Sequence, residues 1–554
     1  MCMYRWLLVI IMTPKGKVFT LTFYLGIFLV ILTGCENSEP AVHQINFDGD
    51  ILVGRPTDQG ASISVMAFSD NQVYIEYGTE RGAYTDRTEP QEIPADDIFV
   101  FELNNLNSDT EYYYRPRFST DASQDIQIFA TGSEYSFDTQ KTVGSSFNFA
   151  VQADPHLGAR TRFQKWCGDR CLREKADDKA FAQTIENMLR HDPDFVVDLG
   201  DIFMTAQNHQ NGLFEIQDRV EGAPVTEAEV LEDVTYLREL FAPLGSSVPV
   251  MLVQGNHEAE DGARLDGTPN NLAVWAVNAR KKYFPSPTDN GFYTGPTREY
   301  DFIGRQDGHY AWEWGNALLV ALDPFWEPNA SNASWDRSLG RDQYNWLKRT
   351  LENSDATFKF VFLHHLIGGC DNSYGGSRGG ALCSDYFEWG GRTPFDYEER
   401  WLNNAPVESG AWDSDPASVP PIRRVDSSTE SYDFDQYRPG WGVSIQDLLL
   451  ENNVQIVFHG HDHLYMQEVH PNGIVYQEVP QPSRVGGEWT EAQIIQGAIL
   501  KNYDAERGVA LENAGFLNVT VTPDEVTVDY VKNIENCTAE PCSEIAHSYS
   551  ITAE

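Results

Sequence analysis

The sequence of 554 residues predicts an all-β sandwich followed by a larger α/β domain. Residues 45–140 contain short runs of β-branched and aromatic residues separated by polar turns, a pattern typical of a sandwich. From residue 147 onward, apolar strands alternate with segments of helical spacing, which indicates α/β layering. A chain of this length has ample material for a hydrophobic core, so it is not a small disulfide-held scaffold.

The N-terminal segment has the features of an export signal. Lys15 and Lys17 precede an apolar run over residues 18–32, which is shorter than the ~20 residues that a membrane-spanning helix needs. The run ends in Leu32-Thr33-Gly34-Cys35, which resembles a bacterial lipoprotein box.

We therefore expect that residues 1–34 are a lipoprotein signal peptide, that Cys35 is lipidated, and that residues 35–44 form a solvated tether. This interpretation places the protein in the cell envelope, anchored in the outer membrane of a Gram-negative bacterium. The alternative is an uncleaved membrane anchor. Translation starts at either Met1 or Met12.

The all-β part is expected to be a fibronectin type III-like sandwich over residues 45–140. Its strands are expected at residues 62–66, 73–77, 98–102 and 112–116. Residues 103–112 also resemble the turn that precedes a late strand in fibronectin type III-like domains.

The α/β part is predicted from its strands, which we expect at residues 147–151, 195–199, 248–253, 318–322, 358–363 and 454–458. Between them, residues such as Phe181, Ile185 and Met188 share one helical face. Two late segments, 516–521 and 526–531, predict a closing hairpin. Long irregular segments are expected at residues 204–246, 258–312 and 366–440.

The cysteines agree with export. Six of the 8 form local pairs, which are Cys167 with Cys171, Cys370 with Cys383, and Cys537 with Cys542. If the compartment is oxidising, such local pairs predict loop-closing disulfides. The pair of Cys167 and Cys171 is the least secure, because helical geometry there would misplace the sulfurs. The last pair lies in an expected C-terminal tail over residues 536–554.

The charge balance limits the partners of this chain. The 40 Lys and Arg residues against 83 Asp and Glu residues give a formal net charge of -43. Such a field repels polyanions, so a nucleic-acid polymer is not an expected partner. Small anionic substrates remain compatible, because a metal cluster can reverse the local sign of the potential.

Polar motifs follow the predicted strands of the α/β part. In order they are Asp154-Pro155-His156, Gly200-Asp201, Gly255-Asn256-His257-Glu258, His364-His365 and Gly460-His461-Asp462-His463. Each motif alone has a plain structural explanation, such as a turn or a packed histidine. Together they offer oxygen and nitrogen ligands of the kind that divalent metals prefer, at strand ends where α/β sites gather.

With these motifs, roughly residues 50–535 resemble the calcineurin-like metallophosphoesterase superfamily, and the preceding sandwich makes the chain most similar to its purple acid phosphatase branch. The resemblance implies a four-layer α/β/β/α domain over residues 145–535 that holds two divalent or mixed-valence metal ions, Fe, Zn or Mn. It implies that the first metal is held by Asp154, His156, Asp201 and His463. It implies that the second is held by Asp201, Asn256, His364 and His461, with Asp201 bridging.

The resemblance implies hydrolysis of phosphomonoesters by in-line attack of a metal-bridging hydroxide. His257 matches the family's general acid, and an imidazole with a pKa near ~6.5 suits that role. Two divalent cations, two carboxylates and a hydroxide leave a centre of about +1, which attracts a phosphoryl group. The choice of His364 over His365 rests on the alignment of the motif alone.

Two alternative functions stay open at this stage. The first is a phosphodiesterase acting on nucleotides or on lipid or glycan phosphates, since the same metal cluster serves both reactions. The second is a catalytically inactive surface binding lipoprotein on the same fold. The complete ligand set argues against the second, because a decayed site is expected to lose at least one ligand.

The sequence departs from the purple acid phosphatase pattern in two places. Met204 stands where those enzymes have a tyrosine ligand, and His156 stands where they usually lack a histidine ligand. We therefore expect no tyrosinate-iron colour. Glu258 either orients His257 or has a structural role. Two arginines after the first motif either bind the phosphate of the substrate or are solvated, and these are Arg160 and Arg162. Several aromatic residues either line a substrate cleft or pack the long loops, and these are Trp312, Trp314, Trp326, Tyr374, Phe387 and Trp389.

Overall fold

The structure, a computed structural model, describes residues 47–119, 129–158, 176–202, 226–326, 339–366, 389, 440–470, 472–484, 508–512, 514–538 and 540–553. Several sequence predictions lie outside these residues, namely the signal peptide with Cys35, the tether, Arg160, Arg162, Met204, Tyr374 and Phe387. Among the described helices, none combines the length and the apolar composition that crossing a bilayer requires.

Only one of the three expected disulfides falls within the described residues. Cys537 and Cys542 are bonded to each other, so this prediction is confirmed. Cys167 and Cys171 lie outside the described residues, and so do Cys370 and Cys383. The disulfide between Cys167 and Cys171 and the disulfide between Cys370 and Cys383 therefore stay predictions from the sequence.

The N-terminal part is a β-sandwich, as the sequence predicts. One sheet has the order β1-β2-β6, with β1 at Gly49–Gly54, β2 at Gly60–Ala67 and β6 at Asp97–Asn104. The second sheet contains β3 (Asn71–Gly78), β4 (Asp86–Arg87), β5 (Gln91–Ile93), β7 (Glu111–Ser119), β8 (Ala130–Thr131) and β9 (Tyr135–Asp138). The turn before β7 is closed by Asn107, whose backbone N–H donates to the Tyr112 hydroxyl over 2.9 Å.

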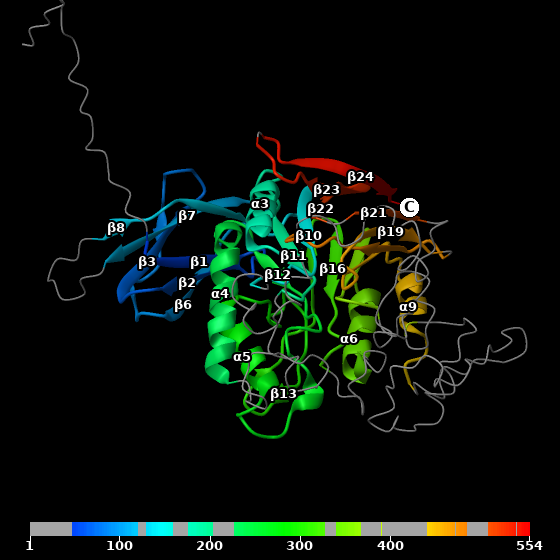
Figure 1. Cartoon of the computed structure of the whole chain (residues 1–554), viewed down its shortest axis with the longest axis horizontal. Helices are drawn as coiled ribbons and strands as arrows, with labels where there is room; N and C mark the ends of the chain where they lie inside the picture. Colours follow the sequence, from blue (N-terminus) through cyan, green and yellow to red (C-terminus); the bar gives the residue numbers. More distant parts are fainter. Residues whose placement is uncertain are drawn as a thin grey trace, which may run out of the picture. The chain divides into compact units, whose positions relative to one another are not determined.

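The α/β part is built on two sheets that share one core (Figure 1). The first sheet has the order β12-β11-β10-β22-β23-β24. Its strands are β10 (Phe147–Gln152), β11 (Phe195–Asp198), β12 (Val250–Leu252), β22 (Gly515–Val521), β23 (Glu525–Asn533) and β24 (Ser543–Thr552). The predicted hairpin is the antiparallel pair of β22 and β23.

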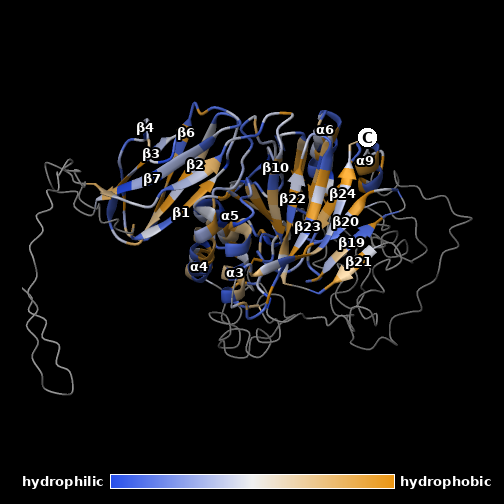
Figure 2. Ribbon diagram, turned by 90° about the horizontal axis from the view of Figure 1, so that it is seen from above, coloured by the Kyte–Doolittle hydropathy of each residue, from blue (hydrophilic) through white to orange (hydrophobic). Residues whose placement is uncertain are grey.

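The second sheet has the order β15-β16-β17-β18-β20-β19-β21. Its strands are β15 (Tyr310–Trp314), β16 (Ala317–Ala321), β17 (Phe358–Phe362), β18 (Ile456–His459), β19 (Tyr465–Val469), β20 (Val475–Glu478) and β21 (Gly508–Leu511). Phe149, Phe360 and Phe458 pack between the two sheets. Hydrophobic residues are frequent along these strands, whereas the connecting loops are largely hydrophilic (Figure 2).

Helices cover the outer faces of both sheets. The first sheet is covered by α3 (Asp178–Leu189), α4 (Glu227–Gly245) and α5 (Leu272–Tyr283), whose buried side chains form a second core. The second sheet is covered by α6 (Gly340–Glu352) and α9 (Ile445–Glu451), which form a third core. The four-layer α/β/β/α arrangement expected from the family resemblance is therefore confirmed (Figure 1).

Two sequence predictions are corrected by the structure. The first is the C-terminal tail, because residues 543–552 form β24, which pairs with β23. Tyr549 and Ile551 alternate with polar residues along this strand and cover the core between the sheets. The disulfide between Cys537 and Cys542 lies in the turn that joins β23 to β24.

The second correction concerns the expected irregular segments: residues 272–283 of the segment 258–312 form helix α5, and residues 227–245 of the segment 204–246 form helix α4. Its apolar residues recur at helical spacing, as in Val230, Val234, Leu237 and Phe241, and all four are buried. A capping box between Thr226 and Glu229 starts this helix.

The sandwich contacts the α/β part through buried polar groups. Arg238 of α4 is fully buried, and its Nε donates to Asp50 Oδ1 over 2.5 Å. The same guanidinium donates to Ser64 Oγ over 2.9 Å, and both acceptors belong to the sandwich. The Tyr114 hydroxyl donates to the Ser246 carbonyl over 2.6 Å. These contacts join β1, β2 and β7 to α4 and the residue that follows it.

Candidate metal centre

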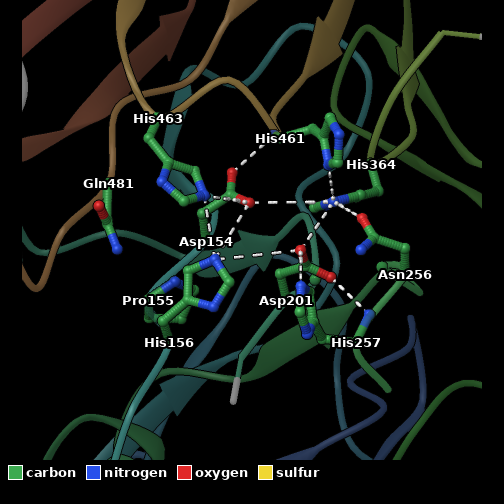
Figure 3. Close-up of polar contacts among 12 residues, drawn as sticks. Asp154, Pro155, His156, Asp201, Asn256, His257, His364, His461, His463 and Gln481 are labelled. Carbon is green, nitrogen blue, oxygen red and sulfur yellow. Dashed lines mark hydrogen bonds and ion pairs between the residues drawn. The ribbon is translucent and has the colours of Figure 1, made fainter. Parts of the chain in front are cut away.

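The predicted motifs lie at the carboxyl ends of parallel strands from both sheets. β10, β11 and β12 pair in parallel in the first sheet, and β16, β17 and β18 do so in the second. The loops that follow β10, β11, β12, β17 and β18 therefore meet at one edge. The close-up shows their side chains directed at one another (Figure 3).

One group of possible ligands consists of Asp154, His156 and His463, all buried. His156 Nε2 lies 3.0 Å from His463 Nε2. Asp154 Oδ1 lies 3.3 Å from His463 Nε2 and 3.8 Å from His156 Nε2. Three side chains from two distant parts of the sequence thus converge on one point.

A second group consists of Asp201, His364 and His461. His364 Nε2 lies 3.2 Å from Asp201 Oδ2 and 3.2 Å from His461 Nδ1. The side-chain oxygen of Asn256 lies 2.9 Å from the same nitrogen, which places the amide beside this group. His364 Nδ1 lies 3.0 Å from the Leu199 carbonyl, and donation from this nitrogen leaves Nε2 as the ligand atom.

The two carboxylates lie between the groups. Asp201 Oδ2, which is 3.2 Å from His364 Nε2, is also 4.0 Å from His156 Nε2 in the first group. Asp154 Oδ1 is 3.8 Å from His364 Nε2 in the second group. Either acid can face both sites, because Asp154 Oδ1 and Asp201 Oδ2 each lie within 4.0 Å of an imidazole nitrogen in both groups, as a bridging ligand can.

The residues fit a pair of divalent cations. Asp154 Oδ1 is buried and accepts no hydrogen bond from any described residue. Two imidazole nitrogens lie near this oxygen, His463 Nε2 at 3.3 Å and His364 Nε2 at 3.8 Å. Such a mixed N and O set is the ligand chemistry of Zn, Mn and Fe.

The charges of the centre are strongly coupled. Burial would raise the pKa of Asp201, but the imidazoles of His257 and His364 hold it well below its usual range. Burial alone would lower the pKa of His364, yet the carboxylates of Asp201 and Asp154 raise it to about 9. Burial and the neighbouring His463 lower the pKa of His156 well below its usual value. Asp201 is therefore ionised and ready to bind cations.

The backbone around the centre adopts unusual conformations. Asp154, His156, Asp201, His461 and His463 all have positive φ, between 44° and 81°. Non-glycine residues rarely occupy this region, and such strain concentrates at functional sites. The conformations are held by loop contacts, such as the His156 N–H donating to the Asp201 carbonyl over 3.1 Å.

Close packing of the loops explains two glycines of the motifs. A Cβ atom at position 255 would lie 2.4 Å from Asp201 Oδ1, and one at position 460 would lie 2.7 Å from Asp154 Oδ2. Gly255 and Gly460 therefore let the backbone approach both carboxylates.

His257 lies beside the two groups and outside both. Its backbone N–H donates to Asp201 Oδ1 over 2.8 Å, and its Nε2 lies 3.7 Å from Asp201 Oδ2. Its side chain keeps 14% of its surface exposed, whereas those of Asp201 and His364 are buried. This position leaves the imidazole next to the centre and accessible from solvent.

The structure bears on two alternatives that the sequence leaves open, the role of Glu258 and the choice between His364 and His365 as the ligand. Glu258 accepts the backbone N–H groups of Ile202 and Gly255 over 2.8 and 2.7 Å, so it braces two loops and has the structural role. His365 packs its ring on Phe325 at 5.0 Å and lies outside both ligand groups, which favours His364 as the ligand.

Most of the aromatic candidates within the described residues pack in cores. Trp312 and Trp314 lie in the core between the sheets, and Trp389 donates from Nε1 to the Tyr476 hydroxyl over 2.9 Å in the third core. The packing explanation is therefore correct for these three residues. Trp326, which lies beyond the end of β16, also packs in a small core with Val274, Val277 and Ile303.

Sequence reasoning missed the segment that follows β20. Gln481 is buried, and the close-up draws it with the ligand side chains (Figure 3). Ser483 donates to the Pro155 carbonyl, and Arg484 Nη1 donates to Gln481 Oε1 over 3.0 Å. The usable signal was that this segment also follows a strand at the same edge, although it has no metal-ligand motif.

Comparisons with known proteins agree with this geometry. The profile of a family described as calcineurin-like phosphoesterases matches residues 147–388. A search of curated protein sequences finds no significant match. The solved structure of PhoD shares the fold, with 14% identity, a TM-score of 0.57, and coverage of 93% of this chain and 92% of that chain.

A purple acid phosphatase from yellow lupin seeds, PPD1, also shares the fold. Its identity is 14% and its TM-score is 0.51, with coverage of 91% of this chain and 74% of that chain. Both likenesses extend over the sandwich and the α/β part together.

Proposed function

The α/β domain of this chain belongs to the calcineurin-like phosphoesterases, and from that premise we propose an exported, lipid-anchored, dinuclear metal-dependent enzyme that hydrolyses phosphomonoesters. The observation that carries the proposal is the place of the Asp201 carboxylate beside both groups of possible ligands. One carboxylate oxygen faces His364 and His156, and the other is fixed by the backbone of His257. A shared carboxylate is what a two-metal centre requires.

The residues that would hold the metals are those that the sequence predicts. They are Asp154, His156, Asp201 and His463 for one cation, and Asp201, Asn256, His364 and His461 for the other. When bound, two Zn, Mn or Fe ions would polarise the phosphoryl oxygens and lower the pKa of a water molecule for in-line attack.

His257 supplies the proton in this proposal. The hydrogen bond from its backbone to Asp201 fixes the start of the side chain, so the imidazole stays beside the shared carboxylate. Its partial exposure leaves a path by which the leaving group departs and the ring regains a proton from solvent. An imidazole can donate a proton near neutral pH, which an Arg or Lys side chain does poorly.

The preference for phosphomonoesters over phosphodiesters is supported by fewer observations than the metal centre is. The yellow lupin protein with the same fold is named a phosphatase. The ligand set itself serves monoesters and diesters alike. The ester preference is therefore the first quantity to measure.

Export is supported by two features. The motif Leu32-Thr33-Gly34-Cys35 resembles a lipoprotein box. The bonded pair Cys537 and Cys542 is typical of proteins from oxidising compartments. Labelling of the expressed protein with radioactive palmitate tests the anchor, and Cys35→Ala should abolish the label and release the protein from membranes.

The decisive experiment uses the chain without its first 35 residues. Bound metals are measured, and p-nitrophenyl phosphate and bis(p-nitrophenyl) phosphate are assayed side by side after loading with Zn, Mn or Fe. Two metals per chain and faster turnover of the monoester support the proposal. Faster turnover of the diester identifies a phosphodiesterase, and no turnover with any metal favours the binding lipoprotein.

A further inference from the structure

A pocket of about 430 Å³ lies beside the metal centre, between residues 289–309 and the first turns of α6. We propose that this pocket is the subsite for a neutral, hydroxyl-rich group of the substrate, a sugar or polyol that carries the phosphate. The inference rests on the proposed phosphoesterase function and names the class of ester. The volume falls in the roughly 300–1,000 Å³ range of small-molecule sites.

The pocket opens at the same edge of the sheet as the metal ligands. Strand β16 runs parallel to β17, so Trp326 beyond the end of β16 and His364 beyond the end of β17 lie at one edge. Phe325 joins the two sites, because its ring packs 6.1 Å from the His364 ring and the next residue, Trp326, lines the pocket. The organic part of an ester held at His364 would pass Phe325 to enter this pocket.

Trp326, one of the lining residues, carries a buried hydrogen-bond donor in need of an acceptor. Trp326 is 5% exposed, and its Nε1 has no hydrogen-bond partner in the described part of the chain. A buried N–H without a partner costs free energy that a ligand oxygen would recover. A hydroxyl or ring oxygen is a suitable acceptor, and a purely apolar group is not.

The back of the pocket is rigid. Gln306 Nε2 donates to Asp323 Oδ2 over 3.0 Å, and Gln343 Nε2 donates to the Asp323 carbonyl over 2.7 Å. Gln306 also donates to Glu260, whose carboxylate receives two hydrogen bonds from Arg280. All five side chains are buried. A wall that is already ordered lowers the entropy cost of binding.

The lining favours a neutral ligand with many hydroxyls. Asp342 and Arg349 of α6 bring opposite charges to the mouth, and Asn345 adds an amide between them. Burial lowers the pKa of His309 to about 3, so this lining imidazole is neutral. Donors and acceptors are thus mixed, which suits hydroxyl groups that act as both.

The aromatic residues of the lining argue against a nucleobase. Trp326 and Tyr300 meet edge to face at 82°, and Trp346 and His309 meet at 57°. Among the described lining residues, these ring pairs are closed on each other instead of forming parallel walls for a planar base. A planar base therefore finds no gap within these paired rings.

The test compares two esters on four proteins loaded with metal. The esters are α-D-glucose 1-phosphate, which has a sugar group, and p-nitrophenyl phosphate, which has none. The proteins are the wild type, Trp326→Phe, Asp342→Asn and Glu352→Gln. Trp326→Phe removes the donor and keeps an aromatic ring. Glu352 lies on the same helix, pairs with Lys348 and does not line the pocket, so it is the matched acid-to-amide control.

We expect kcat/KM for glucose 1-phosphate to fall about tenfold in Trp326→Phe and in Asp342→Asn, the loss that follows from one hydrogen bond. For p-nitrophenyl phosphate the change should stay within about twofold, and Glu352→Gln should match the wild type on both esters. Equal losses on the two esters, or no loss on the sugar ester, would overturn the proposal.

A binding measurement distinguishes an error in the proposed sugar subsite from an error in the proposed phosphoesterase function. If the wild type hydrolyses neither ester, the phosphoesterase proposal fails, and the pocket is then tested with methyl α-D-glucopyranoside by saturation-transfer NMR. A signal that Trp326→Phe abolishes and Glu352→Gln retains supports the pocket. Absence of a signal in the wild type overturns it.

Discussion

Asp201 Oδ2 lies 3.2 Å from His364 Nε2, and this contact joins the loop after β11 in one sheet to the loop after β17 in the other. The same carboxylate reaches towards His156, and its other oxygen holds the backbone of His257. One side chain thus sets the spacing of the two ligand groups and the position of the proposed acid.

Asp201→Asn should remove nearly all activity, by about a hundredfold or more, because the amide cannot neutralise two cations. Metal content per chain should fall in parallel, as measured by inductively coupled plasma mass spectrometry. Asp301→Asn, at an exposed acid outside both ligand groups, serves as the control. An active variant with normal metal content would remove the bridging role from Asp201.

His257→Ala should slow poor leaving groups by about 10² to 10⁴-fold, the usual contribution of a positioned acid. The loss should be small for p-nitrophenyl phosphate, because p-nitrophenolate departs without a proton. The measurement is the dependence of kcat/KM on the pKa of the leaving group for both proteins. The same loss for every leaving group would move His257 into a binding role.

Asp50→Ala should destabilise the protein by about 3 to 5 kcal/mol, because it leaves the buried Arg238 without its charge partner. Urea unfolding followed by tryptophan fluorescence measures the change. Glu89→Ala, at an exposed acid of the same sandwich, should alter the free energy of unfolding by less than about 0.5 kcal/mol. If Asp50→Ala matches that control, the sandwich is not held by this pair.

Asp194 predicts a pH dependence of stability. Burial, only partly offset by Lys141, raises the pKa of Asp194 from 3.8 to about 6. The folded state therefore binds the proton more tightly than the unfolded state, so this group favours folding below pH 3.8 and loses that contribution as the pH rises through about 6. The contribution is about 3 kcal/mol.

Asp194→Asn should therefore flatten the dependence of the free energy of unfolding between about pH 4 and 7, the window that the raised pKa defines. Metal-free protein should be used, because acid also releases bound cations. The exposed Asp301→Asn should retain the pH dependence of the wild type. A variant at Asp194 with an unchanged pH profile would show that this carboxyl keeps an ordinary pKa in the folded protein.

Much of the fold could be predicted from the sequence, because the signals that define it are local. The buried strand 147–151 and the hairpin strands 516–521 and 526–531 lie where apolar periodicity places them. The spacing of Cys537 and Cys542 predicts their disulfide, since only five positions separate them. Strand β24 and helix α4 were not predicted, although both have periodic apolar residues, because most residues between these apolar positions are polar.

The sequence by itself determined which side chains are available at the strand ends and in what order, since a motif such as His461-Asp462-His463 is fixed by the chain. Only the tertiary structure decided which of them converge. His364 and His365 have equal chemistry, yet one meets Asp201 and the other packs on Phe325. Gln481 and Trp326 have no motif at all, and their places depend on how two sheets bring separate loops to one edge. Distances between segments hundreds of residues apart are set by this packing, and no local pattern records them.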